Sequence, residues 1–477
     1  MNRNALLLVS FVVVCITMVF MSACAKKSVA TNNDNASVQA SAYILSQDSP
    51  FLGTWEGTLK AGGASLVLRF AVNQNGVLID VPAQGVKAAA ASEVKVEGNK
   101  LVVVFDSFKA SMEARQVSGD ALEAEWIQGA GRYPLPLVRA NEEALKAAAE
   151  RNAELASRGE KVRFQSVQPG VELEGTLRLP DGSGPFSCLI LITGSGPQDR
   201  DETIHELKPF RDIAEMLALR GWATLRYDDR GVGGSGGSFT GSTSSDFALD
   251  AVGAYRFAVS DSRIDPQRVA LAGHSEGGYV AMLAENAIGG LQGLVLLAAP
   301  GVRGYDILMD QSADLLAAMG ATQVAIAVAA AANKTVYDLI LSSDRFPEDA
   351  VRATLKKAGV PEDQLAIQLA GLSDPWFKHF LNADPAIPLS AIRSPVLALN
   401  GSKDLQVRAD RNLAAIESSI KKTGMPVRTI KLDGLNHLFQ QADSGLPGEY
   451  ASLSSDFNAQ VMETIAAWLE ELPPAKQ

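Results

Sequence analysis

The pentapeptide Gly-His-Ser-Glu-Gly at residues 273–277 places the strongest constraint on how this chain can fold. It lies between a short apolar run, residues 269–272, and a stretch of helix-forming residues, 279–286. The pattern predicts a buried strand, a sharp turn and a helix, followed by a second apolar strand over residues 293–299. In such a turn Ser275 adopts a strained backbone conformation and exposes its hydroxyl at the end of the strand, where it can act as a nucleophile. Glycine is expected at both ends of the pentapeptide because a side chain there would collide with the neighbouring strand or helix.

Strands and helices alternate along the chain on both sides of this turn. A leading hairpin is expected over residues 162–179. Further strands are predicted at 187–193, 223–227, 395–399 and 427–432, and helices at 207–220, 247–259 and 455–472. This alternation predicts an α/β fold, a mostly parallel sheet with helices on both faces, over residues 161–303 and 384–477.

Residues 304–383 interrupt the alternation. They are rich in Ala, Leu, Met and Gln, with helix-like periods and no convincing strand. The interruption falls at the carboxyl edge of the sheet, where open α/β folds bind their ligands. We therefore expect a helical cap inserted over the active site, with apolar stripes that fit helix packing better than the lining of a ligand site.

A serine hydroxyl becomes a strong nucleophile only when a base takes its proton and a carboxylate fixes the tautomer of that base. Asp404 follows the strand predicted at 395–399, 129 residues after Ser275, and His437 follows the next strand, 33 residues later. Both would lie at the carboxyl edge, in the chain order Ser, acid, His. Asp410 and Asp433 are weaker alternatives, because Asp410 should lie inside the next helix and Asp433 is only four residues before the histidine.

A Gly-rich turn, residues 194–201, follows the first apolar strand. Successive backbone N–H groups in such a turn can point at one developing oxyanion. The expected oxyanion hole combines the N–H of Glu276 with the N–H of Ser195, and Gly194 or Gly196 could supply the second donor instead.

Other polar residues near these turns have more modest expected roles. His274 should point away from the serine hydroxyl, so it is not expected to act as the base. His205 and His379 fit structural or solvent-exposed positions better than catalytic ones. Asp228 and Arg230 are expected to form a buried ion pair beneath the turn at Ser275.

Arg200, together with the acidic residues around it, could contact substrate or could brace its own turn. The sequence leaves both roles open.

The first 23 residues have the features of a secretory signal: one positive charge, an apolar run and small residues before Cys24. Residues 21–24 resemble a bacterial lipobox, which predicts a diacylated Cys24 and a lipid-anchored protein of the bacterial cell envelope, exported to the periplasm. The alternative is ordinary cleavage and release. Residues 24–50 have the composition of a flexible tether. Cys15 lies in the leader, so Cys188 has no partner for an intrachain disulfide.

Residues 51–140 form a different pattern of short alternating runs separated by Gly, Asn and Asp turns. They predict a small antiparallel β-domain, a half-barrel or a lipocalin-like meander, with Trp55 and Trp126 on the inner face. Its role could be packing, substrate gating, or binding of a glycan or envelope component. Residues 141–160 suit a connecting helix.

Composition excludes several classes of function. A net charge of −11 argues against a nucleic-acid partner, whose phosphates such a surface repels. The sequence contains neither an H-E-x-x-H motif nor a Cys/His cluster, so we expect no metal and no cofactor.

Three motifs taken together carry a family resemblance: residues 194–201, the Asp-Asp-Arg-Gly-Val-Gly run at 228–233, and the pentapeptide at 273–277. In this combination the chain resembles the α/β-hydrolase superfamily, and within it the bacterial carboxylesterases of the EstD type, which are grouped with serine aminopeptidase-like (S33) hydrolases. The resemblance implies a secreted esterase that acts on small acyl esters through Ser275, Asp404 and His437. Similar proteins also carry a Trp-bearing β-domain ahead of the hydrolase.

The expected function is therefore that of a serine carboxylesterase. A serine peptidase with the same triad is the nearest alternative, and it would need carboxylates in the cap, such as Glu348 and Asp349, to bind a free amino terminus. A non-catalytic envelope binding protein is a third alternative, against which the intact triad argues.

Overall fold

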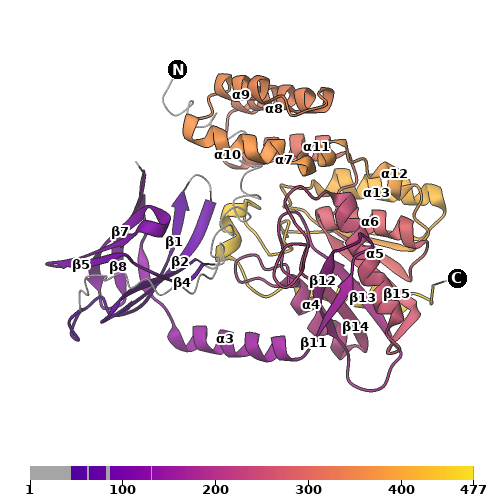
Figure 1. Ribbon diagram of the computed structural model, residues 1–477, viewed down its shortest axis with the longest axis horizontal. Helices are drawn as coiled ribbons and strands as arrows, with labels where there is room; N and C mark the ends of the chain where they lie inside the picture. The colour runs from indigo at the N-terminus through magenta and orange to yellow at the C-terminus, as the bar shows by residue number, and fades with distance from the viewer. Residues whose placement is uncertain (1–44, 62–63, 82–85, 130, 476–477) are drawn as a thin grey trace. The chain divides into compact units, whose positions relative to one another are not determined.

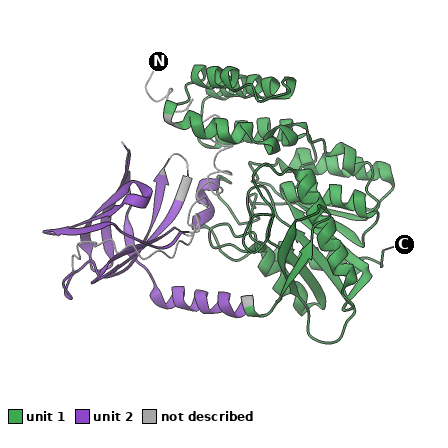
Figure 2. Ribbon diagram, in the orientation of Figure 1, with its two compact units in different colours: residues 1–21, 157–446, 453–477 green, residues 22–156, 447–452 purple. Residues whose placement is uncertain are grey.

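The computed structural model describes residues 45–61, 64–81, 86–129 and 131–475. The predicted signal peptide, Cys24 and most of the predicted tether lie outside these residues, so export and lipid anchoring stay predictions. The described chain divides into two compact units, which Figure 2 shows in different colours. One unit contains residues 45–156 and 447–452, and the other contains residues 157–446 and 453–475.

The first unit is built on one antiparallel sheet. Its strands are β1 (Gly53–Ala61), β2 (Ala64–Asn73), β3 (Gly76–Val81), β4 (Val86–Ala90), β5 (Glu93–Glu97), β6 (Lys100–Phe105), β7 (Ala110–Ser118), β8 (Ala121–Gln128), β9 (Gly131–Pro134) and β10 (Leu137–Arg139). They run in the order β4-β3-β2-β1-β10-β8-β7-β6-β5, with β9 paired to β8. Strands β4 and β5 are the two ends of this path, so the sheet is a half-barrel, one of the two predicted forms.

Aromatic side chains fill the inner face of the half-barrel. Buried and partly exposed residues alternate along β3 and β6, as expected for strands with one covered face. Trp55 is fully buried, and Trp126 lies within 6.4 Å of Phe70 and 6.0 Å of Phe105 between ring centroids. The predicted inward position of both tryptophans is confirmed. Helix α3 (Glu142–Ser157) follows the last strand, where the sequence predicts a helix.

The second unit is built on a mostly parallel sheet (Figure 1). Its strands are β11 (Glu160–Gln165), β12 (Glu172–Arg178), β13 (Phe186–Ile192), β14 (Trp222–Tyr227), β15 (Ile264–His274), β16 (Gly293–Leu297), β17 (Val396–Gly401) and β18 (Val427–Leu432). The order is β11-β12-β14-β13-β15-β16-β17-β18, and only the pairs that involve β12 are antiparallel. All strands from β13 to β18 therefore end at one edge of the sheet.

Helices flank this sheet. They are α4 (Pro209–Leu219), α5 (Ser244–Ser260), α6 (Glu276–Ile288), α13 (Ala409–Thr423) and α14 (Ala459–Glu471). Helices α5, α6 and α13 share a core with Cys188 and Ile190 of β13. Helices α4 and α14 pack against each other. The predicted α/β fold is confirmed.

A helical insert separates β16 from β17. It comprises α7 (Gly304–Ala318), α8 (Gln323–Ser342), α9 (Glu348–Lys357), α10 (Glu362–Ser373), α11 (Pro375–Asn382) and the short α12 (Ala386–Leu389). Helix α8 is long and apolar enough to cross a membrane by length and composition alone. However, Tyr337 and Ile340 of α8 are buried in the core of the insert, and Asn333 donates a hydrogen bond to Ser312 of α7. These contacts make α8 a packing helix of the insert.

Candidate active site

Ser275 lies on the turn between β15 and α6, with φ 52° and ψ −124°. A positive φ is strained for a residue with a side chain, and it persists only where the surroundings hold it. Neighbouring backbone atoms lie very close to the two glycines of the turn, Gly273 and Gly277. A Cβ on Gly273 would lie 2.0 Å from the carbonyl oxygen of Gly277, and one on Gly277 would lie 2.3 Å from the carbonyl oxygens of Ile192 and Thr193. The turn thus adopts the conformation that its sequence predicts.

We expect Gly277→Ala to destabilise the protein by about 1–3 kcal/mol or more, because the added methyl group meets backbone atoms that cannot move without distorting β13. Thermal unfolding followed by circular dichroism measures the change. Gly119→Ala is the control, since a Cβ at Gly119 meets no atom within 4 Å, and it should change stability by less than about 0.5 kcal/mol. Equal melting temperatures for the two variants would contradict the packing argument.

Asp404 and His437 are in direct contact. Asp404 lies in the loop after β17, His437 lies in the loop after β18, and their Oδ2 and Nδ1 atoms are 2.8 Å apart. Both residues are buried, with exposed fractions of 5% and 4%. The second carboxylate oxygen, Oδ1, accepts the N–H groups of Gln406 and Val407 at 2.8 and 2.9 Å. The carboxylate is therefore fixed by its own loop while it faces the imidazole.

The other two candidate acids bind elsewhere. Asp410 lies in α13 and accepts a hydrogen bond from Lys431 at 2.7 Å. Asp433 accepts a hydrogen bond from the hydroxyl of Ser402 at 3.0 Å.

Among the described residues, no hydrogen bond joins the hydroxyl of Ser275 to His437. The two loops are nevertheless connected, because Nε2 of His274 lies 3.0 Å from the carbonyl oxygen of His437.

The turn after β13 lies beside the first turn of α6. The N–H of Gly194 donates to Oε1 of Glu202 at 2.7 Å, so this N–H is not free to face an oxyanion. The side chain of Ser195 lies near the carboxyl of Glu276 and favours the charged form of that group. Glu276 is the first residue of α6, where a backbone N–H has no partner within the helix. The structure thus brings Ser195 and Glu276 together, as the expected oxyanion hole requires, and argues against Gly194.

The carboxyl group of Glu276 also binds the helical insert. It accepts the hydroxyl of Ser244 at 2.5 Å and the indole N–H of Trp376, in α11, at 2.7 Å. Burial raises the pKa of this carboxyl, against the three donors that favour its charged form. Glu276 and Trp376 are a hundred residues apart and share no motif, so the sequence did not indicate this contact.

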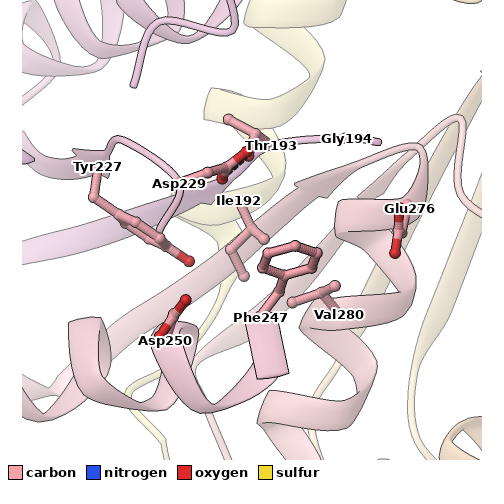
Figure 3. Close-up of a pocket in the computed structure, with 9 residues that line it drawn as sticks. All are labelled: Ile192, Thr193, Gly194, Tyr227, Asp229, Phe247, Asp250, Glu276 and Val280. Carbon is pink, nitrogen blue, oxygen red and sulfur yellow. Dashed lines mark hydrogen bonds between the residues drawn. The ribbon is translucent and has the colours of Figure 1, made fainter. Parts of the chain in front are cut away.

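A small pocket opens beneath these turns, at the carboxyl ends of β13 and β14 (Figure 3). Its lining residues are Ile192, Thr193, Gly194, Tyr227, Asp229, Phe247, Asp250, Glu276 and Val280. Asp229 accepts the hydroxyl of Thr193 at 2.7 Å and the N–H of Gln198 at 2.8 Å. Burial raises the pKa of the Asp229 carboxyl well above its usual value. Asp229 therefore braces the turn that carries Ser195, a role that the sequence did not indicate.

The predicted ion pair between Asp228 and Arg230 is wrong. Asp228 binds Arg200, with its Oδ2 2.6 Å from Nη2, and Arg230 binds Asp250, with Nε 2.7 Å from Oδ2. The reason is topological. Strands β13 and β14 are parallel neighbours, so the loops after them meet, and this brings Arg200 to Asp228.

Arg200 braces its own turn, because it also donates to Glu174 and Thr176 at 2.8 and 3.0 Å. The other two histidines lie apart from the pair of Asp404 and His437. His205 is partly buried, and burial lowers its pKa. His379 is partly buried with Nε2 3.4 Å from the hydroxyl of Ser245.

Known proteins are similar to this chain over the region that contains the site. Residues 204–437 match the family model described as serine aminopeptidase, S33. Esterase EstD from Thermotoga maritima is 28% identical over 300 residues, which cover 62% of this chain and 65% of that protein. The matched region thus spans just under two thirds of the relative's length.

Solved structures of several esterases are also similar. One from Pyrococcus furiosus has a TM-score of 0.43 and 16% identity, over 67% of this chain and 92% of that chain. Est1E from Butyrivibrio proteoclasticus has a TM-score of 0.40 and 16% identity, over 65% and 98%. A thermophilic esterase from Thermogutta terrifontis has a TM-score of 0.37 and 18% identity, over 65% and 98%.

Proposed function

We propose that this chain, which matches the serine aminopeptidase S33 family model over residues 204–437, is an α/β-hydrolase of that family and a serine carboxylesterase that hydrolyses small acyl esters through an acyl-enzyme intermediate. The observation that carries the proposal is the buried contact between Asp404 and His437, at the edge of the sheet where Ser275 lies on a strained turn. The similarity to Esterase EstD from Thermotoga maritima supports an ester as the substrate.

The proposed reaction begins at the imidazole of His437. Asp404 accepts a hydrogen bond from Nδ1–H of His437, and this fixes the tautomer in which the unprotonated Nε2 can take the hydroxyl proton of Ser275. The serine oxygen then attacks the ester carbonyl, and a hydrogen bond between serine and histidine that is loose in the free enzyme tightens in the substrate complex. The protonated His437 gives its proton to the departing alcohol, and the acyl group remains on Ser275. Water attacks this acyl-enzyme with His437 again as base, and the acid leaves.

The negative oxygen of each tetrahedral intermediate needs donors fixed in advance. We assign this role to the N–H groups of Ser195 and Glu276, which lie on adjacent turns with their side chains near each other. Each such donor is typically worth about 10²–10³ in rate. Because Glu202 holds the N–H of Gly194 and Asp229 holds the N–H of Gln198, the turn is braced on both sides of Ser195.

A serine aminopeptidase is the second candidate, favoured by the description of the matching family model. It would need carboxylates that can bind a substrate ammonium group. The acids considered for this role are solvent-exposed in α9, where Glu348 is paired with Arg352. Glu276 is close to Ser275, but its carboxyl already accepts hydrogen bonds from Ser244 and Trp376. These contacts support the esterase.

Turnover of 4-nitrophenyl acetate, butyrate and octanoate, measured beside aminoacyl 4-nitroanilides, tests the proposal. We expect ester hydrolysis that declines as the acyl chain lengthens, and amide hydrolysis slower by at least about 10²-fold, because an amine is a poorer leaving group than a nitrophenolate and needs a proton from the enzyme. Amide turnover equal to ester turnover would favour the peptidase. Turnover of neither class would favour a binding protein.

A further inference from the structure

His274 directly precedes the candidate nucleophile, and both of its ring nitrogens face hydrogen-bond acceptors. Nδ1 lies 2.8 Å from Oε1 of Glu202, and Nε2 lies 3.0 Å from the backbone carbonyl oxygen of His437. The ring is buried with an exposed fraction of 6%, and Glu202 is buried with 1%. The centroids of the His274 and His437 rings are 4.9 Å apart.

These contacts determine how many protons the ring carries. A carbonyl oxygen can only accept, so Nε2 must donate to the carbonyl of His437. Oε1 of Glu202 also accepts the N–H of Gly194 at 2.7 Å, and an ionised carboxylate oxygen can only accept from Nδ1. A neutral imidazole has one N–H and would leave two lone pairs facing each other at one of these contacts. With Glu202 ionised, both contacts are satisfied only when both ring nitrogens are protonated.

We propose that His274 is an imidazolium in the active enzyme and that, with Glu202, it forms a positioning pair which ties together the three turns of the site. Nε2–H of His274 donates to the backbone carbonyl of His437, and Ser275 is the next residue in the chain after His274. Glu202 contacts Nδ1 of His274 and accepts the N–H of Gly194, in the turn that contains Ser195. Neither residue touches substrate in this proposal. The positioning role rests on the proposed hydrolase function, whereas the charge on His274 does not.

The surroundings of the ring favour the charge. Burial on its own lowers the pKa of His274, but Glu202, the carbonyl of His437 and the more distant Asp404 outweigh it, and the pKa lies above its ordinary value. The titratable groups that face the ring are thus Glu202, His437 and Asp404. Glu202 has φ 52°, a strained conformation for a residue with a side chain, so its loop is held in place by these contacts.

The consequence for pH has a definite sign. A histidine whose pKa is raised by folding holds its proton to higher pH than a free imidazole does, and loses it as the pH rises through the raised value. The contact with the carbonyl of His437 is then lost, because an unprotonated Nε2 faces an oxygen. We expect kcat to fall on the alkaline side for this reason.

The first test is a long-range ¹H–¹⁵N spectrum of the full chain with ¹⁵N-labelled histidine, recorded from pH 6 to 10. The chain has four histidines, so His274 is assigned by the signal lost in His274→Gln or, if that variant does not fold, by subtraction with His205→Gln, His379→Gln and His437→Gln. Two protonated ring nitrogens on His274 at pH 8 support the proposal. A neutral His274 ring at pH 8 overturns it. This measurement does not depend on any substrate, so it remains decisive if the esterase proposal fails.

The second test compares pH–rate profiles. His274→Gln should lower kcat about 10–100-fold, the effect expected for a lost charge-assisted hydrogen bond, with KM changed less than about threefold and the alkaline fall in kcat abolished. Glu202→Gln keeps the shape of the side chain but removes its charge, and should shift the alkaline fall to lower pH. His205→Gln and His379→Gln are matched controls and should leave both the rate and the profile unchanged. An alkaline limb that is identical in the native chain and in Glu202→Gln would contradict the positioning role.

Discussion

Ser275→Ala is expected to lower kcat for ester hydrolysis by about 10⁴–10⁶-fold, because it removes the oxygen that is proposed to form the acyl-enzyme. The residual rate would come from the oxyanion donors and from substrate binding alone. The variant should fold, since alanine is smaller than serine and no hydrogen bond from the serine side chain stabilises the turn among the described residues. Initial rates with 4-nitrophenyl acetate measure the loss, and circular dichroism checks the fold.

Ser260→Ala is the matched control, because Ser260 is exposed at the end of α5 and its hydroxyl donates to the local carbonyl oxygen of Phe257. Its activity should stay within about twofold of the native chain. Labelling with a fluorophosphonate adds a covalent readout: the native chain and Ser260→Ala should be labelled on the peptide that contains residue 275, and Ser275→Ala should not. Retained turnover in Ser275→Ala would refute the proposed mechanism.

Asp404→Asn should have the second largest effect, a fall in kcat of about 10⁴-fold with little change in KM. Asparagine can still accept the N–H groups of Gln406 and Val407 through its oxygen, so the loop should keep its shape. Its amide nitrogen would then face Nδ1 of His437 and donate to it. That contact favours the tautomer with a proton on Nε2, which cannot take the proton of Ser275.

The same Asp→Asn substitution at the two other candidate acids, Asp410 and Asp433, provides matched controls. Asp410 binds Lys431 on the surface, and Asp433 binds Ser402, so Asp410→Asn and Asp433→Asn should each lower kcat less than about fivefold. Steady-state kinetics on all three variants makes the comparison. A loss in Asp433→Asn as large as that in Asp404→Asn would reassign the acid.

Much of the architecture could be predicted because its signals are local. The apolar run of β15, the glycines on either side of Ser275 and the helix after it form one continuous stretch, and their order allows few backbone conformations. Asp404 and His437 could be paired from the sequence because each follows a strand of the parallel sheet, and neighbouring parallel strands bring their carboxyl ends to the same edge. Their catalytic roles stay predictions until the variants are measured.

The contacts that could not be predicted join residues far apart in the chain. Glu202 and His274 are 72 residues apart, and Trp376 is a hundred residues from Glu276. A buried carboxylate has no sequence signature that tells which distant donor it will meet. The predicted pair of Asp228 and Arg230 shows the same limit, because proximity along the chain does not imply proximity in space. Each side chain instead binds a residue that the sheet topology brings to it.

The hydrogen bond from Trp376 to Glu276 couples the helical insert to the first turn of α6. The side chain of Glu276 is held by α11, while its backbone N–H is the proposed oxyanion donor. A ligand that strengthens the contact between α11 and Glu276 would therefore also favour the geometry that receives the oxyanion, and by reciprocity an acyl group on Ser275 would strengthen that contact by the same factor. In this way an acyl chain that contacts only the insert can change the rate at the carbonyl.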